Sequence, residues 1–175
     1  MVFVAAVVGV LGLVGCGQSG PEVTPPAAAP SASEAVGEEH VAADTPSESP
    51  TMSGAEKFGA TATWPDGVSL SVSAPKPFKP SESAAGVESA KKFVVIEVTL
   101  KNGSKAPVES SMASLRATSG DQEAESVFDS AKGIEMSSSR VLPGKSLKWR
   151  QVFGQPGSDI AVTADWNFQG PVTFQ

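Results

Sequence analysis

The ten residues KFVVIEVTLK (92–101) are the stretch of this 175-residue sequence that most directly decides its fold. Apolar side chains stand at every second position, at Val94, Ile96, Val98 and Leu100, and the positions between them are mostly polar. Successive side chains of a β-strand point to opposite faces. The period of two therefore predicts a strand with one buried face and one mostly solvent-facing one.

Shorter segments of the same character lie on both sides of this strand, and turn sequences separate them. PDG (65–67) and LPGK (142–145) are two such turns, because proline presets φ and glycine accepts positive φ. No long segment repeats its apolar residues with the 3.6-residue period of a helix. We predict an all-β fold, an antiparallel immunoglobulin-like β-sandwich, with further strands at 60–64, 68–73, 112–118, 123–128, 147–153, 159–168 and 172–174.

The start of the chain has a different character. An apolar run (1–14) leads to Gly15 and to Cys16, the only cysteine in the sequence. The run is too short for a transmembrane helix, which needs about 20 apolar residues. It resembles the lipobox of bacterial lipoprotein signal peptides, in which a small residue precedes a cysteine that receives a diacylglyceryl group. This resemblance implies a signal segment at 1–16, membrane lipid as a partner through Cys16, and a location on the outer face of the cell membrane.

The composition of the next segment predicts that residues 17–57 form a disordered linker. Residues 17–56 contain six prolines, seven acidic residues, no Lys or Arg and no aromatic residue. Such a composition buries too little apolar surface to offset the entropy of ordering. A flexible coil of this length has its ends about 35 Å apart on average.

We predict that residues 58–175 form one compact domain of ordinary size. Residues 57–175 carry thirteen basic and twelve acidic side chains, so the acidity of the chain belongs to the linker. A nearly neutral domain gives no electrostatic reason to expect nucleic acid as a partner.

Histidine and cysteine, two residue types common in catalytic and metal sites, are missing from the domain. The only histidine, His40, lies in the linker, and the only cysteine precedes it. A Ser-His-Asp triad, a cysteine nucleophile and the common zinc sites are therefore excluded from residues 58–175. We predict a protein that is not an enzyme and that carries no cofactor.

Weak candidates for a metal site remain among the carboxylates Asp121, Glu123, Glu125 and Asp129. The first three alternate along a predicted strand, so they share one face, and calcium accepts such oxygens. The spacing lacks the glycine-punctuated loop that wraps calcium, so a solvated strand face is the favoured interpretation.

A surface for a partner is predicted near the longest irregular segment, 74–91, because long loops in compact domains are often functional. Its start, PKPFKP (75–80), presents Lys76, Phe78 and Lys79. Trp64 ends a strand beside a turn and is expected to be partly exposed. Trp149 lies on an apolar strand face and is expected in the core, as are Ile160, Val162, Ala164, Trp166 and Phe168, which share one face of 159–168.

Taken together, the signal, the linker and the segments VVIEVTLKNGSKAPV (94–108) and LPGKSLKWRQVF (142–153) resemble actinobacterial lipoproteins with a DUF4352-type immunoglobulin-like domain. The resemblance implies an extracytoplasmic module of largely unassigned role. The function predicted from the sequence is binding of another cell-envelope component, a protein or a wall polymer. The alternative is a carrier of a small molecule or of a metal, calcium or copper.

Overall fold

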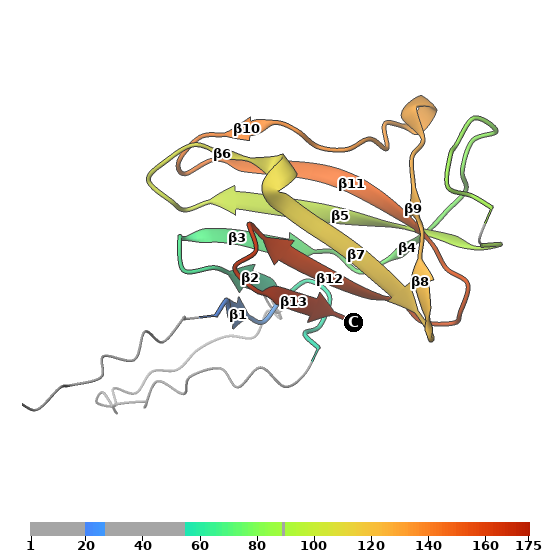
Figure 1. Cartoon of the computed structure of the whole chain (residues 1–175), viewed down its shortest axis with the longest axis horizontal. Helices are drawn as coiled ribbons and strands as arrows, with labels where there is room; N and C mark the ends of the chain where they lie inside the picture. Colours follow the sequence, from blue (N-terminus) through green and yellow to red (C-terminus); the bar gives the residue numbers. More distant parts are fainter. Residues whose placement is uncertain (1–19, 27–54, 89) are drawn as a thin grey trace, which may run out of the picture.

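The computed structural model describes residues 20–26, 55–88 and 90–175 (Figure 1). The predictions for Cys16, His40 and most of the linker lie outside these residues. None of the described segments forms a helix long and apolar enough to cross a membrane.

The described residues form an antiparallel β-sandwich, as predicted. One sheet has the strand order β1-β2-β3-β5-β11-β9, and β4 also pairs with β5. The second sheet has the order β13-β12-β7-β8, and β6 and β10 form a separate ribbon. The strands are β1 Glu22–Thr24, β2 Thr61–Thr63, β3 Val68–Val72, β4 Lys76–Phe78, β5 Phe93–Asn102, β6 Val108–Glu109, β7 Ala113–Ser119, β8 Gln122–Ala124, β9 Ser126–Val127, β10 Arg140–Val141, β11 Ser146–Gly154, β12 Ala161–Trp166 and β13 Pro171–Phe174, with 3-10 turns η1 at Ser110–Met112 and η2 at Ser130–Lys132.

Strand β5 lies at the centre of the first sheet, and its alternation is as predicted. Its apolar side chains Val94, Ile96, Val98 and Leu100 are buried in the main core between the sheets. Strand β11 pairs with one of its edges over nine residues. Strands β3 and β4 pair with its other edge.

The segment 74–91, expected to be irregular, contains part of this edge. Val72 lies opposite Val98, and Lys76 lies opposite Val95. Three residues on the β3–β4 side therefore face two on β5, which is the count of a β-bulge. The sequence did not predict this strand because of Pro75 and Pro77: proline cannot donate to a ladder and is tolerated only at bulges and edges.

A second, smaller core lies on the other face of β5 and β11. It consists of Val127, Ile134 and Val152, and partly buried side chains of the 74–91 segment pack against it, among them Phe78, Ala84 and Val87. These contacts fix the segment to the sheet. The long loop is thus a cover for a second core rather than a solvated insert.

Two aromatic residues differ from expectation. Trp64 is only 1% exposed, and its indole N–H donates to the carbonyl of Gly170 at 2.9 Å, so the prediction that it would be partly exposed was wrong. Phe168 was expected in the core but is 97% exposed, because β12 ends at Trp166. Asn167 and Phe168 have φ of 47° and 60°, the left-handed values of a tight hairpin turn, which rotate the phenyl ring outward.

Strand β1 lies inside the segment expected to be disordered. Glu22, Val23 and Thr24 pair with β2, and Val23 packs against the main core. The rest of the linker, residues 27–54, lies outside the described part of the chain.

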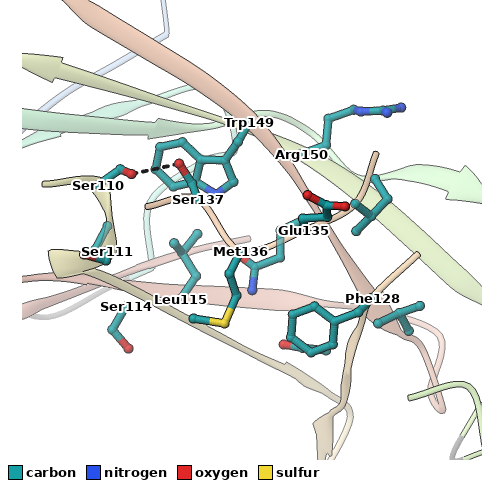
Figure 2. Close-up of a pocket in the computed structure, with 15 residues that line it drawn as sticks. Ser110, Ser111, Ser114, Leu115, Phe128, Glu135, Met136, Ser137, Trp149 and Arg150 are labelled. Carbon is teal, nitrogen blue, oxygen red and sulfur yellow. Dashed lines mark hydrogen bonds between the residues drawn. The ribbon is translucent and has the colours of Figure 1, made fainter. Parts of the chain in front are cut away.

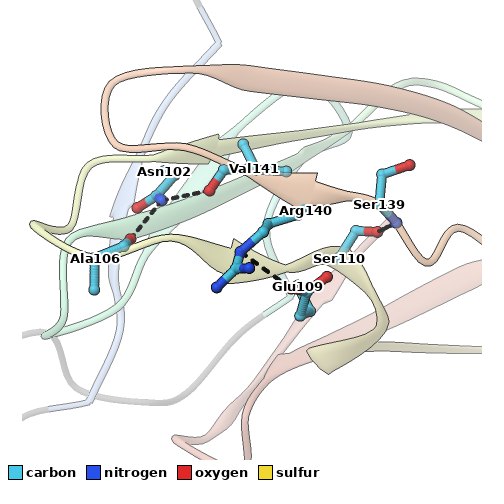
Figure 3. Close-up of polar contacts among 7 residues, drawn as sticks. All are labelled: Asn102, Ala106, Glu109, Ser110, Ser139, Arg140 and Val141. Carbon is cyan, nitrogen blue, oxygen red and sulfur yellow. Dashed lines mark hydrogen bonds and ion pairs between the residues drawn. The ribbon is translucent and has the colours of Figure 1, made fainter.

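The buried side chain of Asn102 ties together the turns at one end of the sandwich (Figure 3). Its amide nitrogen donates to the carbonyls of Ala106 and Val141 at 2.8 and 2.9 Å. Its amide oxygen accepts from the backbone N–H and the hydroxyl of Ser104. Every hydrogen-bonding position of the side chain is therefore used, as a buried amide requires.

We predict that Asn102→Ala lowers the free energy of unfolding by about 2–4 kcal/mol, because several buried polar groups lose their partners at once. Urea denaturation of the variant and of the unmodified protein measures the difference. Lys101→Ala, a change at the exposed neighbouring position, is the control and should leave stability within about 0.5 kcal/mol. Equal stabilities for the two variants would contradict this role of Asn102.

Candidate functional site

The structure separates the residues predicted to bind a partner. Phe78 lies opposite Phe93 at the start of β5, whereas Trp64 is buried near the other end of that strand, where Val68 pairs with Asn102. Lys76 and Lys79 are exposed and Phe78 is half-buried. Phe78 and Lys79 share a shallow depression with Lys91 and Lys92, but Trp64 takes no part in it.

The predicted carboxylate cluster is also dispersed. Asp121 lies in the turn before β8, Glu123 within β8 and Glu125 after it, and all three are exposed. Asp129 is buried and hydrogen bonds elsewhere. Among the described residues, no group of three or more His, Cys, Asp or Glu side chains is placed to hold a metal ion.

Asp129 instead fastens the 74–91 segment. One carboxylate oxygen accepts from the backbone N–H of Ser81 at 2.8 Å, and the other accepts from the Ser81 hydroxyl at 2.7 Å. Burial raises the pKa of this carboxyl, but the two bonds from Ser81 and the charge of Lys132 outweigh burial and hold the pKa below its usual value. The carboxylate is therefore ionised in the folded protein at neutral pH.

A better-formed cleft, which we call the groove, lies along the open side of the sandwich between β7 and β11 (Figure 2). Its volume is about 350 Å³. Apolar side chains from four separate segments converge on it, and small hydroxyl side chains surround them. The lining residues are Ser110, Ser111, Ala113, Ser114, Leu115, Ser126, Val127, Phe128, Ile134, Glu135, Met136, Ser137, Trp149, Arg150 and Gln151.

On one side the groove follows a free strand edge of β11. The backbone N–H of Asn102 donates to the carbonyl of Lys145, so these two residues occupy a hydrogen-bonded position of the antiparallel ladder. Because every second pair of such a ladder is hydrogen-bonded, the odd-numbered residues of β11 bond to β5. The N–H and C=O groups of every second residue from Ser146 to Arg150 therefore point the other way. Strand β9 reaches β11 only at Val152 and the residue after it, so within the described chain no strand pairs with this edge.

The opposite side of the groove has a free edge as well. The N–H of Asn167 donates to the carbonyl of Met112 at 3.1 Å, which fixes the register of β7 against β12. The N–H and C=O of Leu115 therefore point away from β12. Strand β8 stops at Ala124, opposite Ala117, so no described strand pairs with Leu115 on this side.

A strap formed by residues 134–139 lies beside β11 and bounds the groove. At one end the backbones of Ile134 and Asp129 exchange two hydrogen bonds of 2.9 Å. At the other end the Ser110 hydroxyl lies 2.8 Å from that of Ser137 and accepts from the N–H of Ser139 (Figures 2 and 3). Met136, between these fastenings, is 77% exposed.

Sequence reasoning missed the groove because its lining comes from segments that the fold brings together only through long-range pairing. The one local signal was EMSSSR (135–140), where an apolar residue stands in a polar run without strand alternation. The groove contains hydroxyls, one carboxylate and one guanidinium, but neither histidine nor cysteine. Its chemistry suits contact with a ligand by hydrogen bonds and apolar surface.

No family model matches the chain, and no curated protein matches it. The resemblance to DUF4352-type actinobacterial lipoproteins therefore stays a prediction.

Among solved structures, similar chains include a provisionally assigned lipoprotein (ycdA) of Bacillus subtilis, with 17% identity and a TM-score of 0.52 over 62% of this chain and 36% of that one. This chain thus spans about a third of that protein's length. The yjhA protein of Bacillus subtilis gives 14% identity and a TM-score of 0.55 over 68% of this chain and 97% of its own. An uncharacterized β-sandwich protein of Clostridium difficile 630 gives 17% identity and a TM-score of 0.46 over 71% of this chain and 97% of its own. At these identities the first two show a shared fold alone.

We predict that acid weakens the fastening by Asp129. Its pKa is lower in the folded chain than in the unfolded one, so the stability it contributes is complete above the unfolded value, about 3.9, and is lost as pH falls through the folded value. The difference in unfolding free energy between the protein and Asp129→Asn should therefore shrink as the pH is lowered from about 6 through the unfolded pKa and further into acid. Asp121→Asn, at an exposed carboxylate, is the control. A difference for Asp129→Asn that stays constant with pH would contradict the prediction.

Proposed function

We propose that this chain is an exported lipoprotein, anchored through Cys16 to the outer face of the cell membrane, whose non-catalytic sandwich binds another envelope component in the groove. The lipobox-like sequence supports the anchor. The shared fold with a provisionally assigned lipoprotein agrees with it. The observation that carries the binding function is a preformed apolar cleft flanked by two strand edges, with which no strand of the described residues pairs.

The partner that this cleft fits is an extended segment of a protein. Unpaired N–H and C=O groups of a sheet edge bind an added strand through main-chain hydrogen bonds, and neighbouring pockets select its side chains. Leu115 offers such groups on one side and Arg150 on the other. Apolar surface for a partner side chain comes from Met136, Phe128 and Trp149, which Figure 2 shows around one hollow.

A wall polymer fits the groove less well. An anionic wall polymer would be attracted by several exposed cations, and Arg150 is the one cationic side chain in the lining of the groove. The guanidinium of Arg150 already donates to the carbonyl of Lys132. Of the two partners expected from the sequence, the protein is the one that the lining favours.

A carrier of a small apolar molecule is the second candidate. The groove volume of about 350 Å³ falls at the lower end of the range for small-ligand sites, roughly 300–1,000 Å³. The dispersed carboxylates argue against a metal as the cargo within the described residues.

We predict that a photo-cross-linking amino acid at Met136 forms a covalent product with a peptide of an envelope protein in intact cells. Met112 is the matched control, because its side chain is also an exposed methionine but lies outside the groove. Mass spectrometry identifies the cross-linked peptide. Products of equal yield from both positions would contradict a groove-specific contact, and an adduct of small-molecule mass at 136 would favour the carrier.

Once the cross-linked peptide is identified, its affinity for the protein can be measured. Met136→Glu should lower this affinity at least about tenfold, because the substitution buries a charge in an apolar contact. Met112→Glu should leave the affinity unchanged. Hydrogen exchange supplies an independent measurement: the amide of Leu115 should become protected when the peptide binds, because strand addition gives it a hydrogen-bond partner. A bound peptide that leaves this amide unprotected would contradict strand addition.

The anchor is tested by Cys16→Ala. We expect the variant to leave the membrane fraction and its N-terminal peptide to lack the mass of a diacylglyceryl group, because the only sulfur able to form the thioether is gone. Retention in the membrane fraction with an unchanged N-terminal mass would contradict lipidation at this residue.

A further inference from the structure

Strand β1 brings the start of the described chain to the edge of the first sheet. Its three residues lie opposite Thr61–Thr63 of β2, and Val23 packs against the main core. Pro21, just before the strand, is buried. A Cβ added to Gly170 would lie 3.6 Å from Pro21 Cδ, so the chain reaches β1 beside the turn between β12 and β13.

The covalent distance from Cys16 to this point is short. Four residues separate Cys16 from Pro21, so the two Cα atoms are at most about 18 Å apart even in a fully extended chain. If Cys16 carries the lipid, as the proposed function holds, docked β1 keeps this part of the sandwich close to the bilayer. The forty-residue linker does not set the distance while β1 is paired.

Several turns lie together at this end of the sandwich, which we call the proximal end (Figure 1). It comprises the turns at 65–67, 103–107, 142–145 and 167–170. The Gln169 side chain donates to Asp66, and the N–H of Gly103 donates to the carbonyl of Gly67. The N–H of Gly144 donates to the carbonyl of Asn102, which joins the third turn to the others.

The chemistry of this surface is that of a membrane-contacting one. Phe168 and Leu142 are 97% and 55% exposed. Lys105 and Lys145 are exposed on neighbouring turns. The Asp66 carboxylate already accepts from the indole N–H of Trp166 at 2.7 Å. Exposed apolar side chains beside cations suit the boundary between acyl chains and anionic headgroups.

The backbone of Phe168 adds an independent observation. A non-glycine residue at φ 60° is uncommon, because its Cβ crowds the backbone in the left-handed region. Here the strained conformation turns a large apolar side chain out of the core and into full exposure. It does so on the turn that lies beside Pro21.

We propose that the proximal end lies against an anionic phospholipid bilayer, with Phe168 and Leu142 inserted at the interface and Lys105 and Lys145 against the headgroups. The inference rests on the proposed lipid anchor. It fixes the orientation of the domain: the β7–β8 turn at Gly120, at the opposite end of the sandwich, faces away from the membrane (Figure 1).

The test uses the lipidated full chain in vesicles of phosphatidylglycerol and phosphatidylcholine that contain a nitroxide-labelled lipid. Because the Cys16 sulfur is modified, an introduced cysteine is the only thiol and takes a fluorescent label. We expect the label at Leu142→Cys to be quenched several-fold more than the label at Asp121→Cys, which lies at the far end. Adding Phe168→Ser should reduce quenching at 142. Adding Phe128→Ser, the control for an exposed phenylalanine at the other end of the sandwich, should not.

The outcomes separate this inference from the proposed function. If the protein floats with the vesicles and has the lipidated mass but is quenched equally at 142 and 121, the proposed contact of the proximal end with the bilayer is wrong and the anchor is correct. Protein that lacks the mass of the lipid would contradict the proposed lipid anchor at Cys16. As a test of β1, Val23→Asp should lower quenching at 142, because it expels a side chain that packs on the core, whereas Thr24→Asp, at an exposed position of the same strand, should not. Loss from both variants alike would contradict the part played by β1 docking.

Discussion

The rest of the structure depends on one constraint: strand β5 packs against a core on each of its faces and pairs with other strands along both of its edges. One face of the strand supplies the main core and the other supplies Phe93 and Val95 to the second core. Both edges are paired, with β11 on one side and with β3 and β4 on the other. A ten-residue strand buried in this way has a single register, because a slip by one residue would turn Val94, Ile96, Val98 and Leu100 away from the main core. Its two ends then define the two ends of the molecule, the proximal end at Asn102 and the lysine-bearing segment opposite Phe93.

The groove follows from how the sandwich is closed. Strands β8 and β9 are nearly consecutive in sequence but belong to different sheets, so the chain crosses from one sheet to the other there and covers only short parts of β7 and β11. The β6–β10 ribbon closes the other end. Between these closures, the edges face a strap held by hydroxyl and backbone contacts rather than by strand pairing. Proteins usually protect such edges, because unpaired strands associate with other chains. Here the cover is partial, and its most exposed apolar residue, Met136, lies at the opening, which is the geometry that the proposed peptide binding requires.

Local pattern was enough to predict the strands whose burial depends on period alone, such as β5 and β12, and the turns that carry proline and glycine. It failed where burial depends on a distant segment. Trp64 stands beside a turn, yet the β12–β13 hairpin covers it and supplies the carbonyl of Gly170 as an acceptor. Phe168 continues an alternating pattern, yet the hairpin needs left-handed residues at that point. Strand β1 has no apolar period to reveal it, because only Val23 contacts the core and the pairing with β2 supplies the rest. The groove residues share no pattern at all, since they meet only after both sheets have formed.

The docking of β1 and the contact of the proximal end with a bilayer are thermodynamically coupled. A three-residue edge strand with one partly buried side chain is among the least stable elements of any sheet, so its pairing is a local equilibrium. Membrane contact through Phe168 is favoured only when the tether is short, and the tether is short only when β1 is paired. Each event therefore raises the equilibrium constant of the other by the same factor. Burying an aromatic side chain contributes about 1.5–3 kcal/mol, a tenfold or larger shift in such an equilibrium. The same linkage means that a partner pulling on the sandwich from outside would favour unpaired β1 and the full length of the linker.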